Sequence, residues 1–473
     1  MEWESLRFQP YFTATASNVL FYWSHDVGGH RSTVCPSVTE PQEACKFNHT
    51  VAAYDPELYL RWIQWGAHSP ILRTHPQPDP HVERRAWGYN LPVSEFMRAA
   101  FARRARLVPA LFTANHDFET TAIAALRPLY YDWPDSPGAY EHTDSYLFVD
   151  GLLVAPVTSP QGNGTEIATR SLWLPPGSWV DTVSGVELSS PTPAGRFLNY
   201  SATLWEVPVF ARSGTMLPLA PEPGESLACV DPALTHPIIG GAAREPALLT
   251  WEVWPGTAAS GSGGAWEESR GWTNVSYVLS ADGMTLQLRI VPSRPEIPRN
   301  HRFDLQNLPP PSGVAHCQSA TNSPVSSSYD GRSAVISIHA TAPSSIESLC
   351  LAVKFDAPLN SAAVTALRAV PYKSLRQRLH VIKQRFDNLN PRPGTFLMPV
   401  VAATNTAARI DALADAPRPM AAWGAELGSF MAKVAAAVAS IEVWDTKQRG
   451  SQGAAMDSLT ETSKSWLQSS GRL

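Results

Sequence analysis

The residues of this chain that are best suited to chemistry lie in two short segments, each at the end of an apolar run. Asp26 follows the first run and precedes Gly28 and Gly29. Arg73 and His75 end the second run, about fifty residues later. A carboxylate accepts hydrogen bonds, an imidazole donates or accepts them, and a guanidinium pairs with a carboxylate. The pattern predicts that Asp26 and His75 share one pocket.

Three elements must position these residues. Residues 19–23 and 67–72 have the composition of buried strands, and residues 56–65 between them have helical spacing. A parallel α/β barrel is built from strand–helix–strand units, and its active site is formed by polar side chains at the ends of the strands. We therefore expect residues 1–122 to form the last strand–helix units of a (β/α)8 barrel.

Composition excludes several classes of partner. The chain has 473 residues and a formal net charge of −5, so it offers no basic field for nucleic acid. It has no run of roughly 18 apolar residues, the length that a membrane span requires. The 16 Trp and 13 Tyr offer flat faces on which sugar rings stack, although most large aromatic side chains fill cores. We expect neither a nucleic-acid partner nor a membrane span.

Cysteines and glycosylation sequons point to a compartment outside the cytosol. The five cysteines have no zinc-type spacing, so we expect no metal site, but Cys35 and Cys45 bracket a loop that a disulfide could close. Four sequons stand at Asn48, Asn163, Asn199 and Asn274. Residues 1–20 do not resemble a signal peptide. The expected location is secretory or lysosome-like if a preceding segment carries a signal, and otherwise cytoplasmic.

After the barrel part, the pattern changes to short strands with period-2 alternation between Gly, Pro and Asn turns. We expect residues 123–221 to form a proximal β-sandwich, with strands at 146–149, 152–155, 171–174 and 209–212. Residues 222–358 are expected to form a distal β-rich domain, with strands at 248–253 and 286–291 and with loops at 256–264 and 309–313.

The last hundred residues depart from the β pattern. Two amphipathic faces, 375–389 and 423–441, predict a helical hairpin over 359–446. The polar tail over 447–473 is expected to be disordered. The expected fold class is therefore multidomain α/β plus all-β: the C-terminal part of a TIM barrel, two β-sandwich domains and a helical C-terminal hairpin.

Several unusual motifs occur in order along the first 218 residues. They are Trp23-Ser24-His25-Asp26-Val27-Gly28-Gly29, Ser69-Pro70-Ile71-Leu72-Arg73-Thr74-His75, Glu83-Arg84-Arg85, Arg127-Pro128-Leu129-Tyr130-Tyr131-Asp132, Leu152-Leu153-Val154-Ala155-Pro156-Val157, Trp173-Leu174-Pro175-Pro176-Gly177-Ser178-Trp179 and Val207-Pro208-Val209-Phe210-Ala211-Arg212-Ser213-Gly214. Through these motifs, the chain from Trp3 to about Pro218 closely resembles glycoside hydrolase family 31, the retaining α-glucosidases and their relatives.

The resemblance implies hydrolysis of a terminal α-linked glucose or related sugar from oligosaccharides by double displacement, without a cofactor. Asp26 and His75 match family ligands of the sugar in the −1 subsite. The family nucleophile is an Asp in a Trp-X-Asp-Met-Asn-Glu motif that is absent from this sequence, and the acid/base Asp would fall just before Met1. We therefore expect no catalytic residue here and interpret the chain as a partial or split enzyme. The alternative is a non-catalytic remnant that binds sugar or serves as a scaffold.

Each candidate residue has a structural alternative. An Asp before Gly-Gly is commonly a turn residue, and a His before Pro is commonly a loop residue, but the motifs favour sugar binding for Asp26 and His75. Trp23 is predicted to wall the sugar site or to anchor the barrel. Arg73 is expected to hold carboxylates in place rather than to touch the sugar, and the two glycines after Asp26 are expected to shape its loop.

Overall fold

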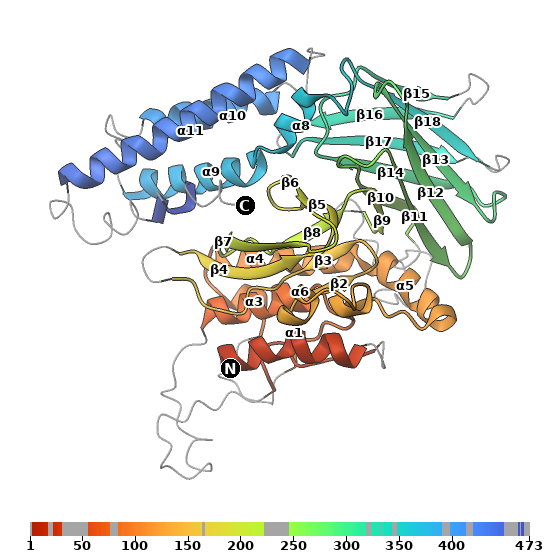
Figure 1. The fold of residues 1–473 in the computed structure, drawn as a ribbon, viewed down its shortest axis with the longest axis horizontal. Helices are drawn as coiled ribbons and strands as arrows, with labels where there is room; N and C mark the ends of the chain where they lie inside the picture. The colour runs from red at the N-terminus through yellow and green to blue at the C-terminus, as the bar shows by residue number, and fades with distance from the viewer. Residues whose placement is uncertain are drawn as a thin grey trace, which may run out of the picture.

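Figure 1 shows the computed structural model of the chain, in which the proximal strands lie between the N-terminal helices and the C-terminal helices. The structure describes residues 2–17, 22–30, 55–75, 84–162, 166–221, 246–317, 323–331, 333–342, 348–389, 398–412, 420–448, 462–463 and 465–467.

The N-terminal part is helical, and its elements are α1 (Trp3–Ser17), α3 (Pro56–Gly66), the 3-10 helix η1 (Ala86–Gly88), α4 (Val93–Arg106) and α5 (Val108–Thr121). The helix predicted over 56–65 is confirmed as α3. Asp55 caps α3 by accepting hydrogen bonds from the backbone N–H groups of Glu57 and Leu58. Every residue of α3 from Leu58 onward is buried, so α3 lies at the centre of this layer.

The strand predicted over 67–72 is wrong. The chain turns directly after α3, and the Ser69 hydroxyl donates to the Gly66 carbonyl oxygen at 2.8 Å within that turn. Between the described residues of the two predicted strands, parallel pairing is limited to one bridge, between Asp26 and Arg73. Of the strand predicted over 19–23, residues 19–21 lie outside the described residues and Tyr22 stands in a turn.

The N-terminal helices share their core with the β-rich part of the chain. Ile63 of α3 and Met97 of α4 belong to the same apolar cluster as Phe148 and Val209, which lie on proximal strands. Burial of such side chains is the main favourable contribution to folding. These helices are therefore held in place by packing on the proximal strands.

The proximal β part contains a six-stranded sheet of order β1-β2-β3-β8-β5-β6 and a separate pair, β4-β7. All of these pairs are antiparallel. The strands predicted in this region correspond to β2, β3, β4 and β8. The elements are β1 (Leu126–Pro128), η2 (Leu129–Tyr131), α6 (Gly138–Glu141), β2 (Tyr146–Phe148), β3 (Leu152–Val154), β4 (Ala168–Leu174), β5 (Gly177–Asp181), β6 (Glu187–Ser190), β7 (Arg196–Ala202) and β8 (Val209–Arg212).

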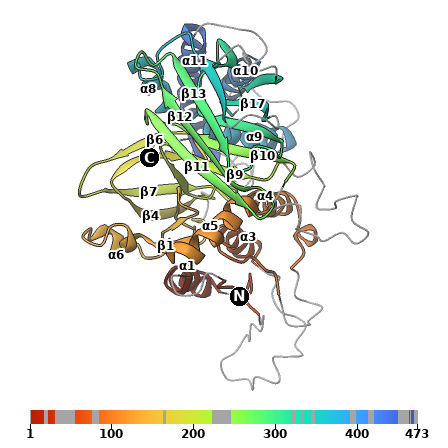
Figure 2. The ribbon, with the colours of Figure 1, turned by 90° about the vertical axis from the view of Figure 1, so that its right-hand side faces the viewer.

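The distal β part is one ten-stranded sheet of order β15-β18-β13-β12-β11-β9-β10-β14-β17-β16. It curls until its two edge strands, β15 and β16, come into contact, as the views in Figures 1 and 2 illustrate. The predicted strands at 248–253 and 286–291 correspond to β10 and β13. The strands are β9 (Thr215–Leu219), β10 (Leu248–Trp254), β11 (Ser260–Glu267), β12 (Gly271–Leu279), β13 (Thr285–Pro292), β14 (Arg299–Gln306), β15 (Gly313–His316), β16 (Val325–Asp330), β17 (Val335–Ala342) and β18 (Leu349–Lys354).

The glycine-rich stretch 256–264, predicted to be a loop, is in large part a strand. β11 begins at Ser260 and lies against β9, where a Cβ at Gly261 or Gly263 would collide with the carbonyl oxygens of Gly214 and Met216. The glycines therefore permit close approach of two strands rather than a flexible connection. The loop predicted at 309–313 is confirmed up to Ser312, and β15 follows it.

A disulfide joins Cys317 and Cys350 across the neighbouring strands β15 and β18, with the two Cα atoms 5.4 Å apart. The backbone N–H of Cys317 donates to the Cys350 carbonyl oxygen at 3.1 Å, so the bond continues the strand pairing. The loop between Cys35 and Cys45 lies outside the described residues.

Within its described residues, the C-terminal part contains α8 (Ala362–Arg368), α9 (Tyr372–Leu389), α10 (Met398–Ala412) and α11 (Met420–Gln448). The two predicted amphipathic faces belong to α9 and α11, but α10 lies between them in sequence and packs against both, so a two-helix hairpin does not describe this region. Within the tail predicted to be disordered, Trp466 is buried and its ring lies 5.1 Å from that of Trp205. No helix in the described part of the chain is long and apolar enough to cross a bilayer.

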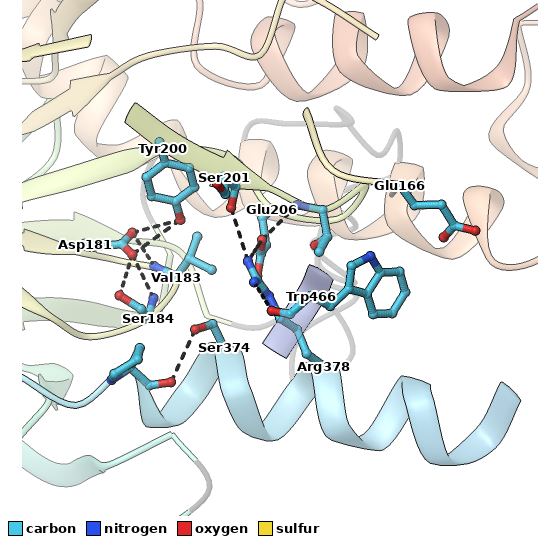
Figure 3. Close-up of polar contacts among 12 residues, drawn as sticks. Glu166, Asp181, Val183, Ser184, Tyr200, Ser201, Glu206, Ser374, Arg378 and Trp466 are labelled. Atoms are coloured by element: carbon cyan, nitrogen blue, oxygen red, sulfur yellow. Dashed lines mark hydrogen bonds and ion pairs between the residues drawn. The ribbon is translucent and has the colours of Figure 1, made fainter. Parts of the chain in front are cut away.

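A buried ion pair fixes α9 on the proximal β part, as Figure 3 shows. Arg378 of α9 donates from Nη2 and Nε to the two carboxylate oxygens of Glu206, at 2.6 and 3.0 Å, and both side chains are almost fully buried. Arg378 also donates to the carbonyl oxygens of Ser201 and Trp466. The Thr203 backbone N–H donates to Glu206 at 2.9 Å. The pair therefore joins α9, the 201–206 segment and the C-terminal tail.

We predict that Arg378→Ala lowers the free energy of urea unfolding by about 3–5 kcal/mol, because it leaves the Glu206 carboxylate buried without its partner. Unfolding is followed by tryptophan fluorescence. Arg289→Ala, at an exposed position of β13, is the matched control and should change stability by less than about 0.5 kcal/mol. Equal stability of the two variants would contradict the structural role of the pair. The double variant Glu206→Leu with Arg378→Met should recover much of the loss, since it removes both charges.

Candidate functional site

Asp26 and Arg73 form the centre of the candidate site. The Val27 backbone N–H donates to the Arg73 carbonyl oxygen at 3.0 Å, which brings the two predicted segments side by side. Arg73 donates from Nε and Nη2 to the same carboxylate oxygen, Asp26 Oδ1, at 2.8 and 2.6 Å. The Asp26 side chain is 17% exposed and that of Arg73 is 53% exposed. Arg73 therefore covers one oxygen of a carboxylate at the edge of the solvent.

Two histidines complete the site. His30 Nδ1 lies 3.2 Å from Asp26 Oδ2, and the His30 and His75 rings have their centroids 5.4 Å apart. Both histidines are exposed. We refer to Asp26, His30, Arg73 and His75 as the Asp26 cluster. Asp26 and His75, predicted to share a pocket, thus lie in one cluster, with His30 between them.

The glycines after Asp26 have backbone conformations that only glycine adopts readily. Gly28 and Gly29 have φ angles of 83° and 78°. Arg84 donates hydrogen bonds from Nη2 to the carbonyl oxygens of Gly28 and Gly29, at 2.9 and 2.8 Å. Its guanidinium also stacks on the ring of Tyr59 in α3, whose hydroxyl donates to the Arg84 carbonyl oxygen at 2.8 Å. Arg84 and Tyr59 therefore hold the Asp26 loop on α3.

The second segment is held by α4. Arg104 donates from its two terminal nitrogens to the carbonyl oxygens of Ser69 and Pro70, just before the segment reaches Arg73. Burial lowers the pKa of Arg104 to about 10, so the side chain is still charged at neutral pH. The charged Arg104 side chain therefore fixes the backbone at Ser69 and Pro70, shortly before Arg73.

His25 and Trp23 have different surroundings from the Asp26 cluster. His25 is packed on Trp65, with ring centroids 3.9 Å apart, and burial lowers its pKa to about 3, so it is neutral at neutral pH. The ring of Trp23 contacts Phe12 of α1, with centroids 5.0 Å apart. This contact agrees with the anchoring alternative for Trp23, and the wall of a sugar site stays a prediction.

The sequence did not reveal the roles of two residues of the site, Arg84 and His30. Arg84 stands in the Glu83-Arg84-Arg85 motif, which identified the segment but not its contact with the glycine turn. His30 is four residues from Asp26 in sequence, and only the turn between them brings its ring next to the Asp26 carboxylate.

Within the described ranges, no group of three or more His, Cys, Asp and Glu side chains is placed to hold a metal ion. The cluster offers hydrogen-bond acceptors and donors for a neutral polar ligand.

We predict that Gly28→Ala destabilises the protein by more than about 1 kcal/mol in urea unfolding, because alanine resists a positive φ. Its Cβ would also stand 2.9 Å from the Arg84 guanidinium carbon and from the Tyr59 ring. Gly313→Ala is the matched control, since a Cβ there meets nothing within 4 Å, and it should change stability by less than about 0.5 kcal/mol. A loss no larger than that of the control would show that Arg84 and Tyr59 do not confine this turn.

Comparison with known proteins identifies the first half of the chain. The model of the glycosyl hydrolases family 31 TIM-barrel domain matches residues 1–114, and that of the family 31 C-terminal domain matches residues 122–217. The chain is 28% identical over 220 residues to an α-xylosidase of Saccharolobus solfataricus, which covers 46% of this chain and 26% of that relative. It is 31% identical over 166 residues to human neutral α-glucosidase AB, covering 35% of this chain and 16% of the relative. The chain thus spans about a quarter or less of these relatives.

The fold is also similar to that of solved structures. A dextranase of Flavobacterium johnsoniae, complexed with glucose, has a TM-score of 0.55 at 18% identity over 74% of this chain and 42% of the other. A cycloalternan-forming enzyme from Listeria monocytogenes, in complex with a pentasaccharide substrate, has a TM-score of 0.55 at 19% identity over 74% of this chain and 31% of the other. These likenesses confirm the predicted fold class of a barrel part followed by β-rich domains. Residues 1–217 thus belong to glycoside hydrolase family 31, as part of its TIM-barrel domain followed by its C-terminal domain.

Proposed function

We propose that this chain supplies the sugar-binding part of an α-glucosidase-type glycoside hydrolase, and that Asp26 and His75 contact the hydroxyl groups of a terminal α-linked sugar. The proposal rests on the partners of the two oxygens of the Asp26 carboxylate. Arg73 occupies Oδ1 with two N–H groups, while Oδ2 lies beside His30. Oδ2 can therefore accept a further hydrogen bond from a sugar hydroxyl. The α-glucosidase and α-xylosidase relatives support this class of ligand.

Each member of the cluster has a physical role in this proposal. A hydrogen bond from a hydroxyl group to an ionised carboxylate is stronger than one between neutral groups, so Asp26 supplies most of the polar binding energy. Arg73 holds the carboxylate in one orientation, which reduces the entropy lost on binding. His75 is exposed beside His30 and can donate to or accept from a second hydroxyl. Trp23 is proposed as a wall of the same site.

Hydrolysis requires more than this cluster. A retaining mechanism uses two carboxyl groups about 5–5.5 Å apart, one as nucleophile and one as acid/base. In the described part of the chain, the side chains that pair with Asp26 through a hydrogen bond or an ion pair are those of Arg73 and His30, and neither is a carboxylate. The nucleophile motif of the resembled family is also absent from the printed sequence. We therefore propose that the 473-residue chain binds sugar without cleaving it.

We predict that the purified chain binds glucose but does not cleave an α-glucoside. The purified chain should not release 4-nitrophenol from 4-nitrophenyl α-D-glucoside. In NMR spectra of the chain labelled with ¹³C-histidine, added glucose should shift the His30 and His75 ring signals, which His30→Gln and His75→Gln assign. Asp26→Asn should weaken glucose binding at these signals by about tenfold or more, because it removes the charged acceptor while keeping the side-chain shape.

Asp135→Asn, an exposed turn carboxylate away from the cluster, is the matched control and should bind glucose as the parent does. Circular dichroism checks that every variant is folded. Glucose binding that leaves both histidine signals unchanged would contradict the proposed site. Release of 4-nitrophenol by the parent, lost in Asp26→Asn, would show that carboxylates within this chain perform the hydrolysis.

A further inference from the structure

A cavity of about 420 Å³ lies where α5, the turn between β2 and β3, and the strands β9, β11 and β12 meet. α5 contacts both β9 and β11, and the ribbon views place it beside the lower end of the curled sheet (Figures 1 and 2). The volume falls in the range of about 300–1,000 Å³ that is usual for small-molecule sites. None of the residues that line it belongs to the Asp26 cluster.

Three charged residues line this cavity: Asp117 of α5, Asp150 of the β2–β3 turn and Arg212 at the end of β8. Burial, followed by the nearby Asp150 carboxylate, raises the pKa of Asp117, and no hydrogen bond to its carboxylate is found in the described part of the chain. Asp150 is exposed and paired with Arg127 Nη1 at 2.7 Å. Asp117 is therefore an acceptor at the cavity wall without a donor.

Arg212 is also a lining residue, and its guanidinium interacts electrostatically with the Asp150 carboxylate. Its guanidinium lies over the rings of Trp133 and Trp179, 5.5 and 5.2 Å from their centroids. Stacking occupies the faces of the guanidinium, while its N–H groups point outward in its plane. Arg212 is more than a third exposed, so these donors are accessible to a ligand.

An indole ring and a strand of small residues form another part of the cavity lining. Trp272 of β12 lies over Gly264 of β11, where a Cβ would stand 3.0 Å from the indole ring. His116 of α5 stacks on Trp266 at 3.9 Å and meets the Trp272 ring edge-on at 5.7 Å, so Trp272 is held in place. Beside it, the Ser260–Gly264 stretch of β11 presents hydroxyl groups and backbone at the cavity. Such a wall combines a flat apolar ring with small polar groups.

We propose that this cavity is a second carbohydrate-binding site, which takes a neutral oligosaccharide and is separate from the Asp26 cluster. Sugar hydroxyls donate to Asp117 and Asp150 and accept from Arg212, and the apolar face of a sugar ring stacks on Trp272. An anionic ligand such as a phosphate would meet two carboxylates and one guanidinium, which is unfavourable. A wholly apolar ligand would leave the Asp117 carboxylate without a donor.

The test is binding of isomaltotriose to the purified full chain, followed by NMR with ¹³C-histidine. The His116 ring signal, assigned with His116→Gln, reports on the cavity, and the His30 and His75 signals report on the Asp26 cluster. Asp117→Asn and Trp272→Ala should each weaken binding at the His116 signal by about tenfold. Asp26→Asn should leave that signal's response unchanged.

Two matched controls accompany these variants. Asp135→Asn is an exposed carboxylate outside the cavity, and Phe197→Ala removes an aromatic side chain of β7 that is 53% exposed. Both should bind isomaltotriose at the His116 signal as the parent does. A His116 signal that does not respond to isomaltotriose in the folded parent would overturn the second site, whatever the Asp26 cluster does. A response that survives in both Asp117→Asn and Trp272→Ala would overturn it as well.

Discussion

The buried carboxylate of Glu206 is the constraint on which the arrangement of this chain depends. It lies fully buried where the N-terminal helices, the proximal strands and α9 meet, and a charge in such a place must be compensated by charged donors. Arg378 compensates it directly from α9. From the other side, Arg61 of α3 donates to the carbonyl oxygens of Thr203 and Glu206 at 2.9 and 3.0 Å. The 203–206 turn therefore ties three parts of the chain that are far apart in sequence.

The position of α3 then determines the candidate sugar site. Because Arg61 anchors α3 on the 203–206 turn, Tyr59 on the same helix has a fixed place under Arg84. Arg84 in turn holds the glycine turn that carries Asp26. The other half of the site follows directly from the end of α3, through the turn closed by Ser69, to Arg73. The Asp26 cluster, in which Arg73, His30 and His75 are exposed and Asp26 is partly buried, is in this way supported by buried contacts.

Much of this arrangement could be predicted from local sequence, and the remainder depends on contacts between distant segments. The helical spacing and Asp-Pro start of α3 are local signals, and alternation identified β2, β3, β4 and β8. The loop prediction for β11 is wrong because glycine lowers strand propensity, whereas the glycines of this strand permit the close approach of β9 and of side chains of β12. Pairing of Cys317 with Cys350 follows from the register of β15 and β18, which no cysteine spacing reveals. The partnership of Arg84 with the glycine turn is likewise a tertiary contact.

The most direct test of the proposed sugar site is a crystal structure of the chain with bound glucose. We expect a glucose ring with one hydroxyl within hydrogen-bond distance of Asp26 Oδ2 and another within hydrogen-bond distance of a His75 ring nitrogen, while Arg73 keeps both of its hydrogen bonds to Oδ1. Glucose bound only at other places, with no ring in contact with Asp26 or His75, would contradict it.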